Sequence, residues 1–160
     1  MATLRFDSTD LGCTEEFLSM AYTKMRIGGR AERTRAQIWR EAAGSLSVDE
    51  LAFDYDMSHN ASEPLGKVCL CSVHSGGIVR QYSQGTEGTE GSFGAGDVFM
   101  YAPHDRPYTG VIQGARYSLI MFDPGLLDQV AATARGRTAE SVRLTGDRPV
   151  HQRPPGCCGA

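Results

Sequence analysis

The feature that most constrains the fold is a two-residue alternation of apolar and polar side chains in the middle of the chain. Within residues 47–57, Leu51, Phe53, Tyr55 and Met57 share one face. The positions between them carry Ala52, Asp54 and Asp56. Successive side chains of a strand point to opposite faces, so this segment is predicted as a half-buried strand. We interpret its two aspartates as solvated charges rather than as an acid–base pair.

The rest of the chain indicates several short strands joined by tight turns. Further strands are predicted over residues 35–42, 67–74, 78–82, 97–101, 108–113 and 117–122. Turns are predicted at 59–66, 75–77, 103–107 and 114, and a flexible loop at 83–96. The 19 glycines and 7 prolines suit such a turn-rich chain.

Two helices and a short strand candidate flank these strands. The first helix is predicted over residues 9–27, capped by Thr9 or Asp10 and ended by Gly28 and Gly29. Its apolar stripe comprises Phe17, Leu18, Ala21, Tyr22 and Met25. The second helix starts at Asp123 and Pro124, and its apolar face comprises Leu126, Leu127, Val130 and Ala131. A strand candidate spans 142–144. The fold class expected is mainly β with flanking α-helices, in a small barrel or sandwich.

Length and charge exclude several classes of protein. A chain of 160 residues is one domain by the usual prior. The net charge of −3 gives no electrostatic footprint for nucleic acid or an anionic membrane. Neither a signal peptide nor an apolar stretch of membrane-spanning length is present, so we expect a soluble, cytoplasmic protein. The odd count of five cysteines then indicates reduced thiols.

Motifs for common catalytic chemistries are missing from the sequence. It holds no Gly-x-Ser-x-Gly elbow, no phosphate-binding loop and no His-Glu-x-x-His pair. Cys69, Cys71 and His74 form the best metal candidate, with both cysteines on one strand face. Because no fourth ligand is evident, we interpret the cysteines as small buried side chains. We predict no catalytic residue, no metal site and no cofactor.

One hairpin suggests a more specific architecture. Residues 94–104 combine a Gly-Asp turn, a short apolar strand and a corner bounded by proline, in the manner of a cupin barrel. Cupin enzymes hold a metal with a His-x-His pair, a glutamate and a later histidine. This chain has His74 alone on the earlier strand, with His104 at the corner and Tyr108 beyond it. Without the metal ligands, a pocket is what remains of the barrel chemistry.

An ordered set of short stretches resembles a known family. They are Glu15–Leu18, Met25–Ile27, Leu46–Met57, Pro64–Gly66, Ser75–Gly76, Gly96–Val98, Ala102–Pro103, Pro107–Tyr108, and Ala115–Tyr117 through Phe122–Pro124. Over about residues 5–150 the chain is similar to the N-terminal domain of AraC-type transcriptional regulators, in the form common in actinomycetes. The resemblance implies a cupin-like β-barrel that binds a small effector and contributes to a homodimer.

The resemblance also sets the expected domain organisation. Residues 1–150 correspond to the effector-binding and dimerisation domain, and residues 151–160 are expected to be an unstructured tail. The helix-turn-helix domain through which the family binds DNA is expected to be absent, so we expect no direct DNA binding by this chain. A truncated or frameshifted gene product and an isolated domain are both compatible with this pattern. The alternative is a stand-alone cupin-like binding protein, or a cupin enzyme with unusual ligands.

Candidate site residues follow from size and polarity. The aromatic residues predicted to line the barrel pocket are Trp39, Phe53, Tyr55, Tyr101 and Tyr117. His74 and Arg116 are the predicted polar handles, and Arg116 could pair with a carboxylate of the ligand. The aromatic side chains could equally be ordinary core, and Arg116 could face outward or pair with Asp97. The predicted dimer interface is Leu126, Leu127 and Val130, which could instead pack on the barrel of the same chain.

Overall fold

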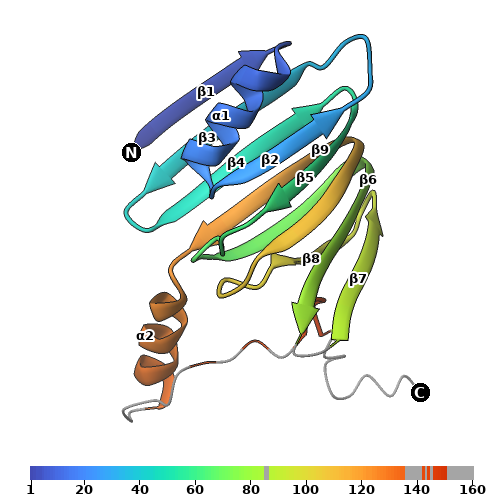
Figure 1. Cartoon of the computed structure of the whole chain (residues 1–160). Helices are drawn as coiled ribbons and strands as arrows, with labels where there is room; N and C mark the ends of the chain where they lie inside the picture. Colours follow the sequence, from blue (N-terminus) through green and yellow to red (C-terminus); the bar gives the residue numbers. More distant parts are fainter. Residues whose placement is uncertain (85–86, 136–141, 143, 145, 151–160) are drawn as a thin grey trace, which may run out of the picture.

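A long, strongly curled sheet with two helices makes up the protein, in a computed structural model that describes residues 1–84, 87–135, 142, 144 and 146–150 (Figure 1). The strands are β1 (Ala2–Ser8), β2 (Met25–Gly29), β3 (Ala36–Ala43), β4 (Leu46–Phe53), β5 (Asp56–Ala61), β6 (Val68–Gln84), β7 (Glu87–Gly94), β8 (Val98–Ala102) and β9 (Tyr108–Phe122). The helices are α1 (Leu11–Ala21) and α2 (Pro124–Arg135). The predicted fold class, mainly β with flanking helices in a cupin-like barrel, is confirmed.

Two long strands, β6 and β9, hold the barrel together by pairing antiparallel along most of their length. The other edge of β9 pairs with β5 over residues 108–113 and with β4 over residues 116–121. The other edge of β6 pairs with β8 and then with β7. One half of the barrel therefore contains β1, β3, β4 and β8, and the other half contains β2, β5 and β7. The two halves share β6 and β9.

The two long strands bend at a pair of glycines that lie against each other. Gly76 in β6 has a φ of +75° and Gly114 in β9 has a φ of +49°. A Cβ atom on Gly76 would lie 2.5 Å from the carbonyl oxygen of Gly114, so no larger residue fits between the strands there. The β6–β9 register shifts between Val73 and Gly77, as expected for bulges that turn a sheet into a barrel.

The predicted turns at 75–77 and 114 are therefore wrong, because the glycines there bend strands that continue. The predicted loop at 83–96 is also wrong in part, since β7 occupies most of it. The predicted strand at 47–57 is two strands, β4 and β5, which pair with different halves of β9. Its alternation continues across the bend, so the pattern alone does not reveal the break. The predicted turn at 59–66 starts later, after Ala61.

The first helix is shorter than predicted, and a strand follows it. Asp10 caps α1 by accepting a 2.7 Å hydrogen bond from the Cys13 amide, as predicted. The helix ends at Ala21, and residues 25–29 form β2 alongside β5. Ser19 and Glu15 of the helix bond the backbone of β2: the Ser19 hydroxyl binds both backbone groups of Met25, and the Glu15 carboxylate accepts from the Ile27 amide. In a longer helix, the backbone groups of Met25 and Ile27 would have bonded within the helix; here they bond the side chains of Ser19 and Glu15.

The first strand, β1, was not predicted. Leu4 and Phe6 alternate with Arg5 and Asp7 there, and the segment pairs with β3 at the edge of the sheet. The phenyl ring of Phe6 stacks on that of Phe17 in α1, with ring centroids 4.2 Å apart. This contact ties the helix to the sheet edge.

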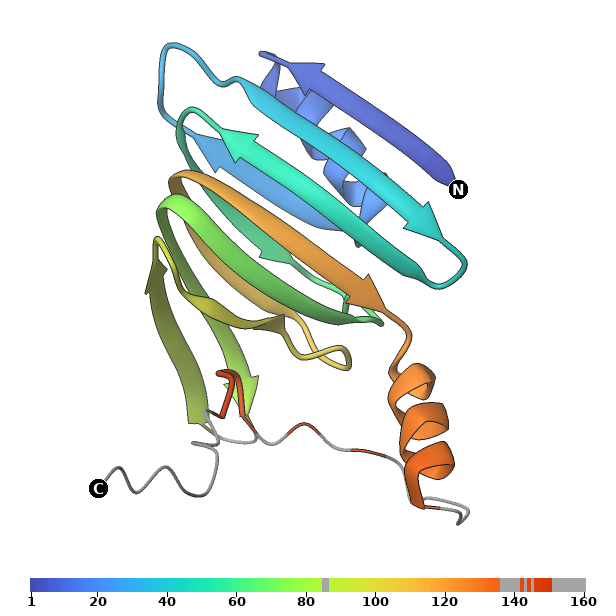
Figure 2. The same cartoon turned by 180° about the vertical axis from the view of Figure 1, so that it is seen from behind.

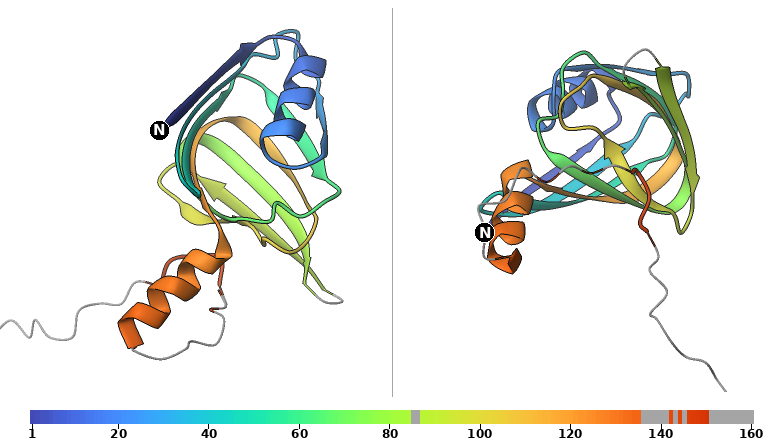
Figure 3. Two further views of the ribbon diagram at one scale, coloured as in Figure 1. Left: turned by 90° about the vertical axis from the view of Figure 1, so that its left-hand side faces the viewer. Right: turned by 90° about the horizontal axis from the view of Figure 1, so that it is seen from below.

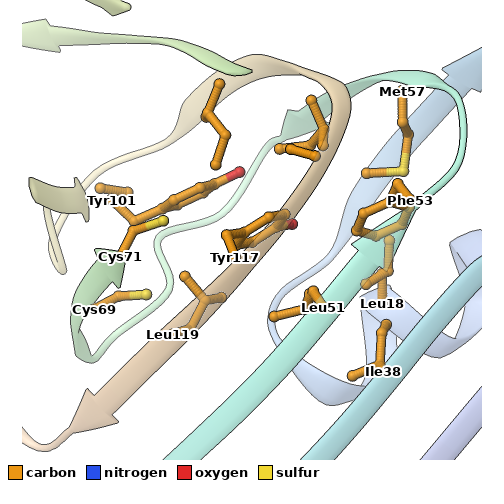
Figure 4. Close-up of a cluster of buried hydrophobic side chains, with 14 of the residues drawn as sticks. Leu18, Ile38, Leu51, Phe53, Met57, Cys69, Cys71, Tyr101, Tyr117 and Leu119 are labelled. Atoms are coloured by element: carbon orange, nitrogen blue, oxygen red, sulfur yellow. The ribbon is translucent and has the colours of Figure 1, made fainter. Parts of the chain in front are cut away.

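The core fills the inside of the curled sheet, and α1 lies on this concave side (Figure 3). Side chains from both halves of the barrel meet there, including Phe53 from β4 and Tyr117 from β9 in one half and Met57 from β5 in the other (Figure 4). Leu51, Phe53, Tyr55 and Met57 are all buried as predicted, and Asp54 and Asp56 are exposed as predicted.

A buried ionic cluster fixes the C-terminal end of α1 to the barrel. The Asp49 side chain is fully buried in β4. Its carboxylate accepts hydrogen bonds from Nε and Nη2 of Arg40, at 2.8 and 2.7 Å, and from the hydroxyl of Tyr22, at 2.6 Å. An unpaired charge is costly away from water, so these three hydrogen bonds are what stabilise the Asp49 carboxylate in the interior.

The second helix starts directly after β9 and projects from the lower end of the barrel (Figure 1). The prediction of a helix beginning at Pro124 is confirmed. Leu126 and Leu127 are half-buried, and Val130 is 61% exposed. The short strand candidate at 142–144 is wrong at Val142 and Leu144, which lie outside any strand, while residue 143 lies outside the described residues. The expected tail at 151–160 also lies outside them.

Candidate ligand-binding site

A small cavity lies inside the barrel beneath α1 and the loop between β5 and β6. It is lined by Leu18, Tyr22, Met25, Leu51, Phe53, Met57, His59, Leu65, Cys69, Tyr101, Tyr108, Tyr117 and Leu119. Its volume of about 30 Å³ leaves room for about two water molecules. Leu18 and Leu65 come from the segments that cover the barrel, and the other lining residues come mostly from the strands. The site is therefore a small, largely apolar and partly open space between the strands and the segments that cover them.

Its polar character comes from a histidine and a group of tyrosines. The hydroxyl of Tyr101 lies 3.1 Å from Nε2 of His59, and the two rings stack with centroids 5.9 Å apart. The ring of Tyr108 meets both of them edge-on. Among the described residues, Nδ1 of His59 has no hydrogen-bond partner. The interior thus offers a ring nitrogen that a ligand could use.

Burial keeps these groups neutral. It lowers the pKa of His59 to about 4, because a charged imidazolium would be poorly solvated in the barrel. The same cause raises the pKa values of Tyr101, Tyr108 and Tyr117 above the ordinary range of a phenol. At neutral pH the interior is therefore an uncharged hydrogen-bonding surface of phenols and one imidazole.

The structure separates the predicted pocket residues into two groups. Phe53, Tyr101 and Tyr117 line the interior cavity. Tyr55 is buried beside Phe53, edge-on at 6.0 Å between ring centroids, but does not line the cavity. Burial raises its pKa to about 12. Ligand binding by any of these residues stays a prediction.

The predicted pocket residues Trp39, His74 and Arg116 lie instead on the outer face of the sheet, so Arg116 takes its outward alternative. Trp39 is 43% exposed, and the guanidinium of Arg5 lies 5.4 Å from its ring centroid. All three predicted residues border one open groove of about 860 Å³ on the convex side of β1, β3, β4 and β9. The reason is strand parity: each of the three occupies a position next to an inward-facing residue, such as Ile38 beside Trp39.

A histidine and a glutamate of this outer groove contact a serine beside it, but the three do not form a nucleophilic triad. The hydroxyl of Ser118 lies 2.5 Å from Nε2 of His74 and donates a 2.7 Å hydrogen bond to Oε1 of Glu50. The other oxygen of Glu50 lies 3.7 Å from the same ring nitrogen. In a catalytic triad the carboxylate holds the opposite ring nitrogen. Here both acceptors compete for one hydroxyl, which describes a surface hydrogen-bond cluster.

The best metal candidate of the sequence is divided between the two faces of β6. Cys69 and Cys71 are fully buried, and burial raises the pKa of each thiol. His74 is exposed on the other side. The interpretation of the cysteines as small buried side chains is confirmed. Over the part of the chain that the structure describes, no three His, Cys, Asp or Glu side chains gather as metal ligands.

Two buried polar residues, His59 and Arg80, were missed by sequence reasoning. His59 was assigned to a turn, although it continues the alternation of Tyr55 and Met57. Arg80 stands between Ile78 and Tyr82 on the apolar side of its strand, and it is fully buried. The sequence does carry a signal for Arg80: it is a charged residue at a position where the two-residue pattern calls for an apolar one.

The fold and the internal site define the class of protein: a cupin-like β-barrel with a small cavity. An AraC-like transcriptional activator, CuxR, has a similar structure, with a TM-score of 0.57 and 20% sequence identity over 83% of this chain and 52% of that one. Oxalate decarboxylase from Lactobacillus farciminis matches with a TM-score of 0.47 and 12% identity, over 94% and 49% of the two chains. The chain thus spans about half the length of each of these proteins.

The likeness to the AraC-like activator shows the fold alone and leaves the function to the site itself. No protein-family model and no curated protein sequence matches the chain. None of the helices in the described residues is long and apolar enough to cross a membrane.

Proposed function

We propose that this chain is the effector-binding part of an AraC-type transcriptional regulator, acting in the cytoplasm and binding a small organic molecule inside its barrel. The observation that carries the proposal is the His59–Tyr101 pair at a largely apolar cavity inside the barrel. Ligand sites are mostly apolar with a few placed polar groups, and this cavity has that composition. The similar fold of an AraC-like activator supports the regulator role.

The effector has to be admitted by movement of the cover. A cavity of about 30 Å³ is smaller than a typical ligand pocket of roughly 300–1,000 Å³. Leu65 is only half-buried, and its loop is held by hydrogen bonds from Gly66 to the carbonyl of His104 and from Thr23 to the carbonyls of Glu63 and Pro64. Displacing Leu65 and Leu18 enlarges the cavity without breaking a β-sheet hydrogen bond. Binding then stabilises the open cover by mass action.

The role proposed is binding rather than catalysis. Nε2 of His59 is engaged by Tyr101, and burial favours the protonated thiols of Cys69 and Cys71. A buried, protonated thiol is a poor nucleophile. These residues therefore serve to shape the cavity and to orient a ligand.

The second part of the proposal is self-association through α2. Leu126, Leu127 and Val130 follow one side of this helix, which projects from the barrel (Figure 1). The large exposed fraction of Val130 leaves an apolar surface for a second copy of the chain. Two-fold pairing of such helices is the commonest closed assembly.

A screen of small organic molecules by thermal shift tests the proposed binding, followed by titration calorimetry on each hit. The variant Leu65→Trp places a larger ring at the half-buried cover and should lower hit affinity at least tenfold. The matched control Val48→Trp adds the same ring on the outer face of β4, where Val48 is 40% exposed, and should leave affinity unchanged. Equal affinities for the two variants would contradict binding in the cavity.

A further inference from the structure

Arg80 is a fully buried arginine at the end of the barrel remote from α1. Its two cross-strand neighbours are both glycines, Gly110 in β9 and Gly91 in β7. A Cβ atom on Gly91 would lie 2.6 Å from the ring of Phe93 and 3.5 Å from Nη2 of Arg80. Because both neighbours lack a side chain, the space beside Arg80 is free for its guanidinium and the surrounding aromatic rings.

Three aromatic rings surround the guanidinium. Its central carbon lies 4.6 Å from the ring centroid of Tyr82, 5.3 Å from that of Phe93 and 5.7 Å from that of Phe99. The rings of Phe93 and Phe99 are nearly parallel, with centroids 3.5 Å apart. Aromatic faces attract a cation but accept few of its N–H groups, so the edge of the guanidinium still needs oxygen acceptors.

Only part of that need is met by the residues that the structure describes. Nη2 of Arg80 donates a 2.5 Å hydrogen bond to Oδ2 of Asp147. Nε and Nη1 are buried and have no hydrogen-bond partner among the described residues. Burying a charged group with unsatisfied donors is costly, so this site has unused capacity for an anionic acceptor.

Asp147 reaches Arg80 from a segment that follows α2 in the chain. The segment lies against the lower ends of β6 and β7, where it is drawn in red (Figure 2). The carbonyl of Asp147 accepts a 2.7 Å hydrogen bond from the Met100 amide. Arg148 lies 4.9 Å from the ring centroid of Phe93 and 3.8 Å from Oδ1 of Asp97. The Asp147 side chain is 32% exposed, so the carboxylate can be exchanged with one from solvent.

We infer that Arg80 and its three aromatic rings form a binding site for a small carboxylate, which Asp147 occupies from within the chain. This site goes beyond the proposed function, because neither Arg80 nor any of its three rings lines the cavity that contains His59 and Tyr101. A flat apolar body on the carboxylate suits a site built from Tyr82, Phe93 and Phe99. A free carboxylate can take two parallel hydrogen bonds from an arginine, whereas Asp147 takes one in this structure.

Ligand binding and release of the 146–150 segment are then coupled. A carboxylate that replaces Asp147 removes the ion pair that holds this segment to β6. Conversely, Asp147 competes with the ligand and weakens its apparent affinity. The occupied and released forms differ in the position of residues 146–150, which is how the barrel reports its ligand.

Chemical rescue by acetate tests the site, because acetate is the group that Asp147→Ala deletes. Acetate at 10–100 mM (roughly the range of millimolar affinities) should raise the thermal midpoint of Asp147→Ala above that of the same variant in chloride. Acetamide, the neutral isostere, should not. Benzoate should bind Asp147→Ala at least tenfold more tightly than it binds the unmodified chain. The matched control Asp54→Ala removes an exposed carboxylate and should behave like the unmodified chain.

A second variant keeps the inference testable on a folded protein. Arg80→Met replaces the guanidinium with an apolar side chain of similar length, which a buried position tolerates. Combined with Asp147→Ala, it should abolish the response to acetate and benzoate. A response that persists in the double variant, or no response in Asp147→Ala, overturns the carboxylate site.

The two proposals can fail separately. Suppose that screening hits depend on Leu65 but ignore Arg80 and Asp147. The barrel then binds its effector as proposed, and the carboxylate inference alone is wrong. If acetate and benzoate bind at Arg80 while the Leu65→Trp variant affects no ligand, the carboxylate site stands and the proposed cavity is wrong.

Discussion

The hydroxyl of Tyr101 lies 3.1 Å from Nε2 of His59 inside the barrel, where both side chains are buried. This contact joins β8 to β5, which lie in different halves of the barrel and do not pair with each other. Burial favours the neutral form of both groups, because an imidazolium or a phenolate would be poorly solvated there. The stability of the barrel therefore depends on the protonation of one histidine.

Acid should destabilise the protein through His59. Its folded pKa of about 4 lies below the unfolded value of about 6.5, so the unfolded state binds the proton more readily. The contribution is fully present above pH 6.5 and is lost as pH falls toward 4. The free energy of unfolding should fall by up to about 3 kcal/mol over this range, as measured by urea denaturation at several pH values.

Two variants separate this effect from other titrations. His59→Gln should flatten the dependence between pH 6.5 and 5, because the titrating group is gone. His104→Gln removes an exposed histidine and should leave the slope unchanged. A slope that is the same in all three proteins would show that His59 is not the cause.

The Asp49 cluster should contribute far more to the free energy of unfolding than a similar ion pair on the surface. Asp49→Ala leaves Arg40 and Tyr22 without their acceptor in the interior, and we expect a loss of about 3 kcal/mol in the free energy of unfolding. Asp7→Ala breaks an equally well-formed pair with Arg35 that is exposed, and should have little effect. Equal losses in chemical denaturation would mean that burial does not set the strength of these pairs.

Gly76 should be the least replaceable glycine of the described turns and bends. Gly76→Ala combines a positive φ with a Cβ atom 2.5 Å from the Gly114 oxygen. Gly44→Ala shares the positive φ but meets no atom within 4 Å. The second variant should cost about 1 kcal/mol and the first a further 1–3 kcal/mol, both measured by thermal and urea unfolding. Equal costs for the two variants would show that the contact with Gly114 does not restrict residue 76.

Removing the apolar surface of α2 should produce a monomer. Val130→Glu introduces a charge into the proposed interface, while Thr133→Glu places the same charge at another exposed position of the helix. Light scattering at tens of micromolar (a concentration at which weak homodimers form) should give a dimer for the unmodified chain and for Thr133→Glu, and a monomer for Val130→Glu. A monomer in all three cases contradicts the proposed dimer.

Local pattern predicted most strands, but it could not predict which strands are continuous. Gly76 and Gly114 have the sequence signature of hairpin turns, and only their mutual contact across β6 and β9 explains why both strands continue. Residues 25–29 extend the apolar stripe of α1 in sequence, yet Ser19 and Glu15 divert them into β2. Such choices depend on long-range pairing, which a single sequence does not display.

Which side chains lie inside the barrel could be predicted in part from their size. Which face of its strand a residue occupies could not be predicted from the sequence. Phe53 and Tyr117 lie inside as large apolar residues should. Trp39 and Arg116 lie outside because the start of each strand fixes its parity, and an error of one residue reverses the face. Arg80 was overlooked because an inward arginine is rare. Its acceptor, Asp147, is 67 residues away in the chain.

The most direct test of the central claim is where a screening hit perturbs the methyl resonances of the protein. We expect the resonances of Met57 and Leu119, which line the cavity, to shift on titration, while those of Val48 and Ile120 on the outer face stay fixed. Shifts confined to Val48 and Ile120, with Met57 and Leu119 unchanged at saturation, would place the ligand on the outer surface and contradict binding inside the barrel.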